Sequence, residues 1–392
     1  MSEHAGNPIK VAQVITRFIR GGAQENTLLT VEGLARRPEY TLTLITGPAL
    51  GPEGDMIDDA RRSGVEVVVI DSLRRAIHPW RDLLAYRALR REFRRIRPAI
   101  VHTHSSKAGI LARAAAKAEH VPRIVHTIHG LPFHDYENPA LNRLYVWLER
   151  RAARYTDLLI SVADAMTAKA VAARVASRDK FVTIYSGMDV EPFLRGGFDR
   201  RSVRQGLGMA PDATVIGVIA RISPLKGHEF ILRAAPAVLA RHPGVTFLFV
   251  GDGHIRAEME QLARETGVFD RIVWAGLRDY GEIPELLSAM DVLVHASLRE
   301  GLARVLPQAF LSGVPVVSYD VDGAREVVVH GETGWLVEPE SVGGLADAVC
   351  AALDDLDAAR AMAEVGRQVC ARRFPAQVMV DAIAAAYRRL LE

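Results

Sequence analysis

The chain has 392 residues, of which 49% are hydrophobic and 24% are charged, and its formal net charge at pH 7 is +2. This length exceeds the size at which one hydrophobic core keeps growing, so two α/β domains are expected rather than one. The composition is typical of a soluble globular protein and excludes a largely disordered chain.

Three further features predict a cytoplasmic protein without membrane spans or disulfides. The N-terminus, residues 1–7, lacks the basic flank and apolar core of a signal peptide. No run of about 18 apolar residues, the length of a spanning helix, occurs in the sequence. The only two cysteines, Cys350 and Cys370, are too few for a disulfide framework or a cysteine metal site, and we expect both to be packing residues.

Short apolar runs alternate with helical patterns along the whole chain, which indicates parallel sheets wrapped by helices. Strands are expected in the first half at 10–16, 40–46, 65–71, 99–103, 123–128, 157–162 and 181–185. In the second half they are expected at 215–220, 246–250, 272–275, 292–296 and 314–318. Each half therefore has the pattern of a Rossmann-like unit.

Two segments mark the organisation of the chain outside these units. Residues 187–197, which contain Pro192, Gly196 and Gly197, interrupt the pattern and are the candidate linker. After Phe374 and Pro375 comes a last helix, which in proteins of this architecture often crosses back onto the first domain. We expect domains at 1–188 and 189–373, with the terminal helix at 374–392.

The net charge hides a difference between the halves. Residues 1–188 hold 28 Lys and Arg against 19 Asp and Glu, a net of +9, which leaves −7 for the remainder. Seven arginines fall within residues 81–97, and helical spacing gives them a basic face, with Leu84, Leu89, Phe93 and Ile96 available for an apolar side. This face is either an ordinary solvated surface or a docking surface for anionic lipid headgroups, where each basic residue adds about 1 kcal/mol.

The first expected strand is followed by Gly21 and Gly22, which open a helical pattern over 23–36. Glycines at such a turn let backbone N–H groups approach a ligand, and a helix N-terminus favours an anion, although a Gly-Gly pair is more often only a turn. No G-x-G-x-x-G follows any strand, so neither a nicotinamide nor a flavin cofactor is expected.

A stronger pattern is the stretch 220–227, which follows an expected strand and leads into a helix. It places Arg221 and Lys226 at the carboxyl end of a parallel strand, where open α/β sheets bind ligands. An arginine fork and a lysine point charge could together neutralise a diphosphate, and the alternative is a pair of surface cations.

The stretch 300–308 directly follows the expected strand 292–296. Glu300, Gly301 and a helix start supply a carboxylate for hydroxyl groups and backbone N–H donors for an oxyanion. Gln308 follows Glu300 by eight positions, so two turns of helix would place both on one face. The alternative for Glu300 is an ordinary acid at a helix start.

Histidines gather at two neighbouring strand ends. Alternation puts His102 and His104 on one face of their strand, which raises the question of a metal site. No Asp, Glu or Cys stands at ligand spacing among them, so metal binding is not expected. His129, which follows the strand 123–128, is either a ligand for a sugar hydroxyl or phosphate oxygen, or a satisfied core histidine.

These motifs, in this order, resemble family-4 glycosyltransferases of the GT-B fold, and the match spans nearly the whole chain. The stretches 101–109 and 127–133 resemble more narrowly the bacterial branch that builds capsular and other exported polysaccharides. The motifs that carry the resemblance are Gly21-Gly22-Ala23, His129-Gly130, Ser186-Gly187-Met188-Asp189, Arg221 with Lys226-Gly227, Glu300 with Gln308, and the stretch 331–337.

The resemblance implies a fold and a role for each matching residue. Two Rossmann-like domains would face each other across a cleft, with the C-terminal helix returning to the first domain. Arg221 and Lys226 would hold the donor diphosphate with help from the Gly22 amide, and His129 would lie beside the reacting sugar. The donor-sugar contacts would come from Glu300, Gly301, Leu302 and Ala303, the ribose contact from Gln308, the base contacts from Gly276 and Leu277, and acceptor contacts from His102 and His104.

Two departures from the family pattern concern the donor site. The second carboxylate of the family motif is here Gln308, and the usual Asn-Gly-x-Asp is here Ser186-Gly187-Met188-Asp189. Gln308 can still accept from a ribose hydroxyl, so the change bears on nucleotide preference more than on activity. The family generally works without a metal, so the resemblance implies none here.

We therefore expect a retaining enzyme that moves a hexose-type sugar from a nucleoside-diphosphate donor, a UDP-sugar, to a hydroxyl group. The acceptor would be a lipid-linked or saccharide intermediate, the enzyme could contact the inner face of the cell membrane, and no cofactor or nucleic acid is expected. Two rivals remain open. One is a nucleotide-sugar 2-epimerase, which needs no acceptor, and the other is an inactive nucleotide-sugar-binding protein, suggested by Gln308.

Overall fold

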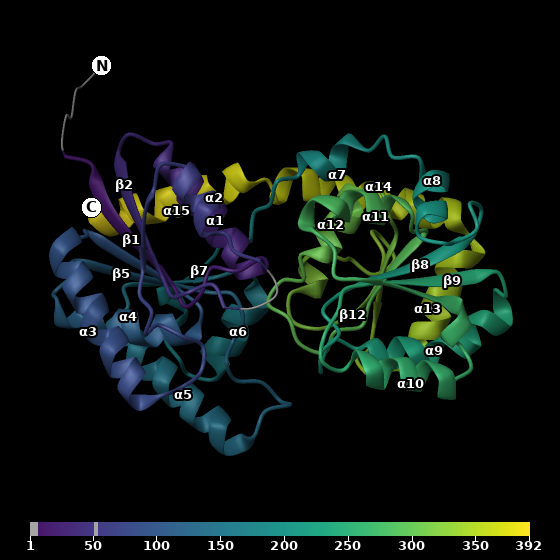
Figure 1. The fold of residues 1–392 in the computed structure, drawn as a ribbon, viewed down its shortest axis with the longest axis horizontal. Helices are drawn as coiled ribbons and strands as arrows, with labels where there is room; N and C mark the ends of the chain where they lie inside the picture. The colour runs from purple at the N-terminus through teal and green to yellow at the C-terminus, as the bar shows by residue number, and fades with distance from the viewer. Residues whose placement is uncertain (1–6, 51–53) are drawn as a thin grey trace. The chain divides into compact units, whose positions relative to one another are not determined.

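A computed structural model describes residues 7–50 and 54–392, so most of the polar N-terminal segment used above lies outside the described part. The chain divides into two compact units (Figure 1). Unit 1 extends to Met188 and includes Pro375–Glu392, and unit 2 is Asp189–Phe374. Each unit is described separately below.

Unit 1 is built on a seven-stranded sheet in the order β3-β2-β1-β4-β5-β6-β7, and every recorded pairing is parallel. Its strands are β1 Ile9–Ile15, β2 Tyr40–Thr46, β3 Glu66–Val69, β4 Ile100–His104, β5 Arg123–Ile128, β6 Leu158–Ser161 and β7 Phe181–Thr183. Its helices are α1 Gly22–Ala35, α2 Ile57–Arg62, α3 Pro79–Ile96, α4 Ser106–Ala118, α5 Pro139–Ala153, α6 Asp164–Ala172, η1 Arg178–Lys180 and α15 Ala376–Leu391.

Unit 2 repeats this plan with a six-stranded parallel sheet in the order β10-β9-β8-β11-β12-β13. Its strands are β8 Thr214–Ile219, β9 Val245–Val250, β10 Ile272–Gly276, β11 Val292–His295, β12 Val316–Tyr319 and β13 Trp335–Val337. Its helices are α7 Glu191–Arg195, α8 Arg200–Gly206, α9 His228–Arg241, α10 Arg256–Glu265, η2 Phe269–Arg271, η3 Tyr280–Glu282, α11 Ile283–Ser288, α12 Val305–Leu311, η4 Ala324–Glu326, α13 Val342–Asp354 and α14 Leu356–Arg373.

The expected α/β class with two Rossmann-like sheets is confirmed, and the structure adds two local features. Trp335–Val337, treated above only as part of a motif, forms β13 at the edge of the second sheet. The candidate linker 187–197 is not entirely irregular, because Glu191–Arg195 forms α7 with Pro192 in its first turn. Proline is tolerated there because the first helical N–H groups have no partner within the helix.

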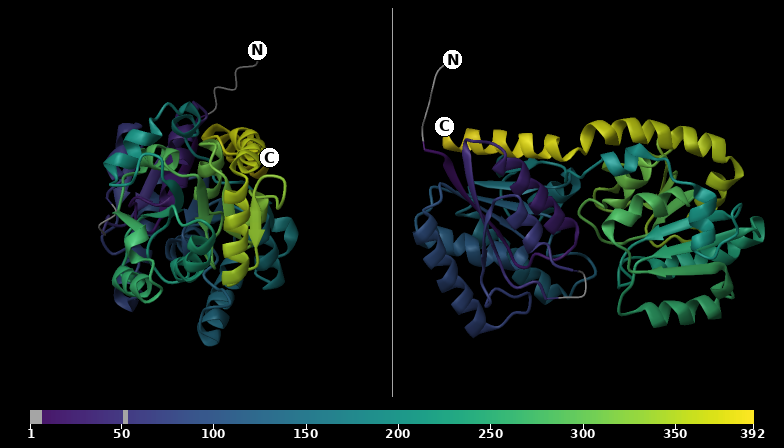
Figure 2. Two further views of the ribbon diagram at one scale, coloured as in Figure 1. Left: turned by 90° about the vertical axis from the view of Figure 1, so that its right-hand side faces the viewer. Right: turned by 45° about the horizontal axis from the view of Figure 1, so that its top comes forward.

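The C-terminal helix α15 packs on unit 1, as expected. Its entry is fixed by the Ala376 N–H, which donates to the Met188 carbonyl at 3.0 Å. The helix lies beside α1 (Figures 1 and 2), and an ion pair joins Arg37 to Asp381. Contact is close at Gly33, where an added Cβ would lie 2.5 Å from a Val380 methyl carbon.

Alternation along β1 divides the core of unit 1 into two layers. Val11 and Ile15 belong to a cluster with α1 and α15, whereas Ala12 and Val14 pack with α3 and α4. Both faces of the sheet are thus covered, which explains why its strands are almost continuously apolar. Cys350 and Cys370 are buried and unpaired in unit 2. Within the described residues, no helix is long and apolar enough to cross a membrane.

The contact between Gly33 and Val380 predicts that Gly33→Ala destabilises unit 1. The added methyl group must displace a buried β-branched side chain, an overpacking that typically costs about 1–3 kcal/mol. In a Val380→Ala background the same change should be neutral or stabilising by up to about 1 kcal/mol, because alanine is the better helix former. Denaturant unfolding of the four proteins measures this coupling, and additive effects of the two changes would contradict the proposed contact.

Candidate active site

The strand order of unit 2 brings the loops after β8 and β11 together. β8 pairs with β9 on one side and with β11 on the other, so chain connections leave this point in opposite directions. Open α/β sheets bind ligands at the carboxyl ends of the strands at such a switch point. The two stretches singled out above, 220–227 and 300–308, follow these two strands.

Backbone contacts bind the two loops to each other. The Leu225 carbonyl accepts from the Leu298 N–H at 2.9 Å and from the Ser297 hydroxyl at 3.0 Å. Gly227 precedes α9 with φ 76°, and a Cβ at this position would lie 1.8 Å from the Ala296 carbonyl oxygen. A side chain at 227 would therefore force the loops apart, so the approach requires glycine.

Lys226 and Glu300 form an ion pair across these loops. The Lys226 Nζ lies 2.5 Å from Glu300 Oε1, and His295 Nε2 lies 3.3 Å from the same oxygen. The Glu300 N–H donates to Asp322 Oδ2 at 2.6 Å, which fixes the backbone under the carboxylate. The Glu300 side chain is 17% exposed, so the pair remains partly open to a ligand.

The charge state of Glu300 follows from these contacts. Burial alone would raise the pKa of this carboxyl group, but the Lys226 charge and the hydrogen bonds from His295 and Lys226 hold the pKa well below its usual range. Glu300 is therefore an anion at neutral pH, able to accept hydrogen bonds from hydroxyl groups. A polyanionic ligand near Lys226 would compete with Glu300 for the ammonium group.

The other residues assigned to this site fall around the same strand ends. Arg221 is exposed on the loop after β8. Leu302 and Ala303 are buried in the segment that precedes α12, and the Gly301 carbonyl accepts from Gly323 N–H at 3.3 Å. Gly276 ends β10 and Leu277 after it is 61% exposed, so both lie at the carboxyl edge of the sheet.

The expectation that Glu300 and Gln308 share one helix face is wrong. α12 begins only at Val305, so Glu300 lies in the loop before the helix and the eight-residue spacing does not correspond to two helical turns. Gln308 is buried, and its amide nitrogen lies 3.2 Å from the Tyr280 hydroxyl. The Arg304 guanidinium lies 6.0 Å from the centre of the Tyr280 ring, which places a positive charge close to this contact.

Unit 1 has a cavity of about 260 Å³ at the carboxyl ends of its central strands. Its lining includes Ala23 at the start of α1, Ser105 and Ser106 at the start of α4, and His129 after β5. Gly22 is the first residue of α1, next to Ala23. The cavity therefore brings together His129 and the glycine turn that the sequence singled out.

His102 and His104 share a face of β4, as expected, but they are not placed to contact an acceptor. Both residues are 0% exposed. The ring of His102 is bonded to the Tyr387 and Thr127 hydroxyls, and that of His104 to Gln13 and His129. Direct acceptor contact is thus corrected to an internal role, because all four ring nitrogens already meet protein groups.

Sequence reasoning missed three side chains near the carboxyl ends of the strands of unit 2. His295 and Asp322 contact Glu300, and Tyr280 contacts Gln308. His295 is the last residue of β11, and Asp322 lies just after β12. Their position at strand ends was the available signal. Tyr280 carried no such signal, because its contact depends on how η3 packs against α12. Across residues 7–50 and 54–392, no group of three or more His, Cys, Asp or Glu is arranged to hold a metal ion.

Comparisons with known proteins identify both units. Residues 20–192 match the family described as Glycosyltransferase Family 4, and residues 199–369 match Glycosyl transferases group 1. The UDP-Gal:alpha-D-GlcNAc-diphosphoundecaprenol alpha-1,3-galactosyltransferase of Escherichia coli is 28% identical over 350 residues, 88% of each chain. The 2-deoxystreptamine glucosyltransferase of Streptomyces kanamyceticus is 30% identical over 257 residues, 65% of each chain.

A solved structure shows the same fold. The crystal structure of Anabaena Alr3699/HepE in complex with UDP and glucose has a TM-score of 0.81 to this chain at 23% identity. The similarity covers 97% of this chain and 99% of that one. The fold is therefore shared with that protein.

Proposed function

The chain belongs to the family-4, group 1 glycosyltransferases of the GT-B fold, which use nucleotide-sugar donors, and we propose that it transfers a hexose from UDP to an acceptor hydroxyl with retention at the anomeric carbon. The Lys226–Glu300 pair at the switch point of unit 2 is the observation that carries this proposal. Binding of a nucleotide-sugar calls for a cation beside the diphosphate and an acceptor for the sugar hydroxyls. Lys226 and Glu300 supply these two groups side by side.

The proposed roles of the donor residues follow from their chemistry. Arg221 and Lys226 neutralise the diphosphate as negative charge develops on it, and the backbone around Leu302 and Ala303 approaches the sugar or phosphate. Glu300, released from Lys226, accepts from the sugar hydroxyls. The leaving phosphate helps to deprotonate the acceptor, which is consistent with front-face attack and needs no separate general base.

The proposed acceptor is a lipid-linked saccharide of cell-envelope polysaccharide assembly. Support comes from the Escherichia coli relative, whose name specifies a GlcNAc-diphosphoundecaprenol acceptor and a UDP-galactose donor. A screen of UDP-sugars against polyprenyl-diphosphate saccharides, read by mass spectrometry, tests the proposal. Donor turnover without an acceptor would favour an epimerase, and tight donor binding without product over a broad acceptor panel would favour an inactive binding protein.

We predict that activity survives EDTA and that Lys226→Ala lowers kcat about a hundredfold, on the order of 3 kcal/mol. The loss has two parts, because the variant removes a cation and leaves the Glu300 charge unbalanced beside the diphosphate. Lys117→Ala, on the outer surface of α4, is the matched control and should retain full activity. Abolition by the chelator with rescue by magnesium or manganese would overturn metal independence.

We predict different kinetic effects at Glu300 and Gln308. Glu300→Gln should mainly lower kcat, because the carboxylate holds the sugar in its reacting position. Gln308→Ala should raise the donor KM and largely spare kcat, because a ribose contact acts equally in ground and transition states. Gln308→Glu should be tolerated or should tighten donor binding, since the new carboxylate lies near the Arg304 guanidinium.

Steady-state kinetics with donor varied at saturating acceptor test this division, with Glu338→Gln as a surface control. Thermal melts must first show that each variant is folded, because Gln308 is buried. A silent Glu300→Gln together with a large loss of kcat in Gln308→Ala would show that the two roles are assigned the wrong way round.

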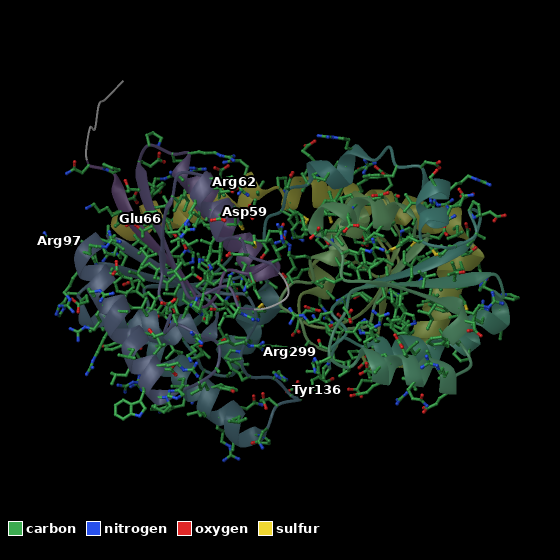
Figure 3. The ribbon with its side chains drawn as sticks, in the orientation of Figure 1. Asp59, Arg62, Glu66, Arg97, Tyr136 and Arg299 are labelled. Carbon is green, nitrogen blue, oxygen red and sulfur yellow. The ribbon has the colours of Figure 1, made fainter. Side chains whose placement is uncertain are left out.

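We also propose peripheral contact with anionic membranes, through a different part of α3 from the one that the arginine pattern suggested. Arg90 and Arg94 pair with Glu119, and Arg95 pairs with Glu66, which is labelled in Figure 3. Glu92 serves both Arg91 and Arg95. These carboxylates neutralise much of the basic face.

The exposed apolar side chains lie nearer the start of α3. Leu84, which was expected on the apolar side of α3, is 55% exposed, and Trp80 one turn earlier is 73% exposed. Trp147 of α5 is exposed too, with the Arg151 guanidinium 6.0 Å from its ring centre. α4 packs between α3 and α5 on one side of the sheet (Figure 1). Tryptophan, leucine and arginine together suit the headgroup region of a bilayer.

We predict that the protein sediments with vesicles of phosphatidylcholine and phosphatidylglycerol at low salt and that binding falls as salt rises. Trp80→Ser combined with Leu84→Ser should abolish most of this binding. Arg90→Gln combined with Arg94→Gln should reduce it less, because both guanidinium groups are already paired with the carboxylate of Glu119. The reverse ranking would restore the arginine run as the docking surface, and no binding at low salt would remove the membrane contact altogether.

A further inference from the structure

A chain of buried hydrogen bonds runs from the C-terminal helix to His129. The Tyr387 hydroxyl of α15 lies 3.0 Å from Gln13 Nε2, and Gln13 Oε1 lies 2.7 Å from His104 Nε2. On the other side of the same ring, His104 Nδ1 lies 3.0 Å from His129 Nε2. The two ring planes are inclined by 27°, and the ring centres lie 5.2 Å apart. Tyr387 also contacts His102 Nδ1 at 2.6 Å.

The fold places these groups on one face of the first sheet. Gln13 of β1 is in register with His102 of β4, and alternation puts His104 on the same side. α15 covers this face and supplies Tyr387. Gln13, His102, His104 and Tyr387 are all 0% exposed. Each polar atom in the chain must therefore be satisfied by its neighbours, because water is not available to replace them.

The buried histidines are neutral, which gives each ring one donor and one acceptor. Burial lowers the pKa of His102 to about 3, with a smaller contribution from His129. Burial likewise holds the pKa of His104 well below its usual range. Neither ring can donate from both nitrogens at neutral pH, so the direction of one hydrogen bond determines the direction of the next.

The Gln13 amide sets that direction. Its carbonyl oxygen faces His104, so His104 Nε2 carries the proton and donates to it. His104 Nδ1 is then an acceptor, and His129 Nε2 must carry a proton and donate to it. The Gln13 amide nitrogen donates to Tyr387, whose hydroxyl donates to His102 Nδ1. With the amide reversed, every bond would reverse and the proton of His129 would sit on Nδ1.

We propose that Gln13, held in orientation by Tyr387, is a positioning residue that keeps His129 in its Nε2–H tautomer. When the His129 ring is neutral, its Nδ1 is then a hydrogen-bond acceptor. An acceptor nitrogen can bind a sugar hydroxyl but not a phosphate oxygen, which has no proton to donate at neutral pH. This series of hydrogen bonds thereby favours a sugar hydroxyl over a phosphate oxygen, the two ligands that the sequence left open for His129. The choice of ligand rests on the proposed glycosyltransfer.

The tautomer can be measured without any assay of activity. The full chain labelled with ¹⁵N-histidine gives long-range ¹H–¹⁵N spectra, in which His129→Gln identifies the His129 signals. We expect protonated Nε2 and unprotonated Nδ1 in the free protein. Gln13→Met removes the carbonyl acceptor and the NH2 donor of the amide at similar volume and should give a mixture of tautomers. Protonated Nδ1 in the parent protein, or an unchanged tautomer in Gln13→Met, would overturn the proposal.

Tyr387→Phe provides a second variant should Gln13→Met fail to fold. It removes the acceptor of the Gln13 amide, so the amide loses its preferred orientation and the tautomers should again mix. Tyr40→Phe is the matched control: the Tyr40 hydroxyl lies 3.4 Å from the Ala384 carbonyl of the same helix, and its ring packs on Tyr387. The variant removes a buried tyrosine hydroxyl beside α15 but leaves the hydrogen bonds from Tyr387 to His129 intact, so His129 should keep its tautomer.

Kinetics then separate control of the His129 tautomer from the catalytic role proposed for His129. Gln13→Met and Tyr387→Phe should lower kcat about tenfold with little change in donor KM, whereas Tyr40→Phe should keep the parent kcat. A tautomer shift with unchanged kcat would support the positioning role of Gln13 and Tyr387 but refute the position of His129 beside the reacting sugar. Equal losses of kcat in all three variants would assign the effect to packing of α15 and overturn the positioning role.

Discussion

The pairing of β8 with β11 is the constraint on which the candidate site of unit 2 depends. Parallel strands bring their carboxyl ends to one edge, and the reversal of strand order at this pair leaves room between the connections that follow. Lys226 and Glu300 are 74 residues apart in sequence, yet they are in contact because each follows one of these strands. Gly227 makes the approach sterically possible, since a larger residue would collide with the end of β11.

Most of this architecture could be predicted from the sequence, because it rests on local patterns. Apolar runs located twelve of the thirteen strands in the described residues, and the site loops follow directly from strand ends. The prediction failed where spacing was converted into helical geometry without knowledge of where the helix begins. Glu300 and Gln308 were placed on one face by counting residues, but the segment before Val305 is a loop held by the contact between Glu300 and Asp322.

Long-range packing explains the other errors. His102 and His104 looked available because they stand at a strand end, where ligands bind. Their burial depends on α15, whose Tyr387 lies 285 residues after His102 in the sequence, and no local pattern reveals that contact. Leu84 was assigned to the same apolar side of α3 as Leu89 and Phe93, but the neighbouring α4 covers only the face that carries Ala85, Leu89 and Phe93.

The two units hold their polar side chains by different physical means, and the difference matches the ligands proposed for them. In unit 2, Lys226 keeps Glu300 charged. The proposed anionic donor can pair with Lys226 in place of Glu300, which leaves the carboxylate free to accept hydrogen bonds. In unit 1, burial keeps His102 and His104 neutral, so no ion pair forms there. The direction of the hydrogen bonds instead determines which ring nitrogen of His129 carries the proton. Charge exchange suits recognition of a diphosphate, whose attraction to a cation is strong at any orientation. A hydroxyl group is uncharged, so its recognition depends on whether the facing atom donates or accepts, which is the property that the oriented chain from Tyr387 to His129 controls.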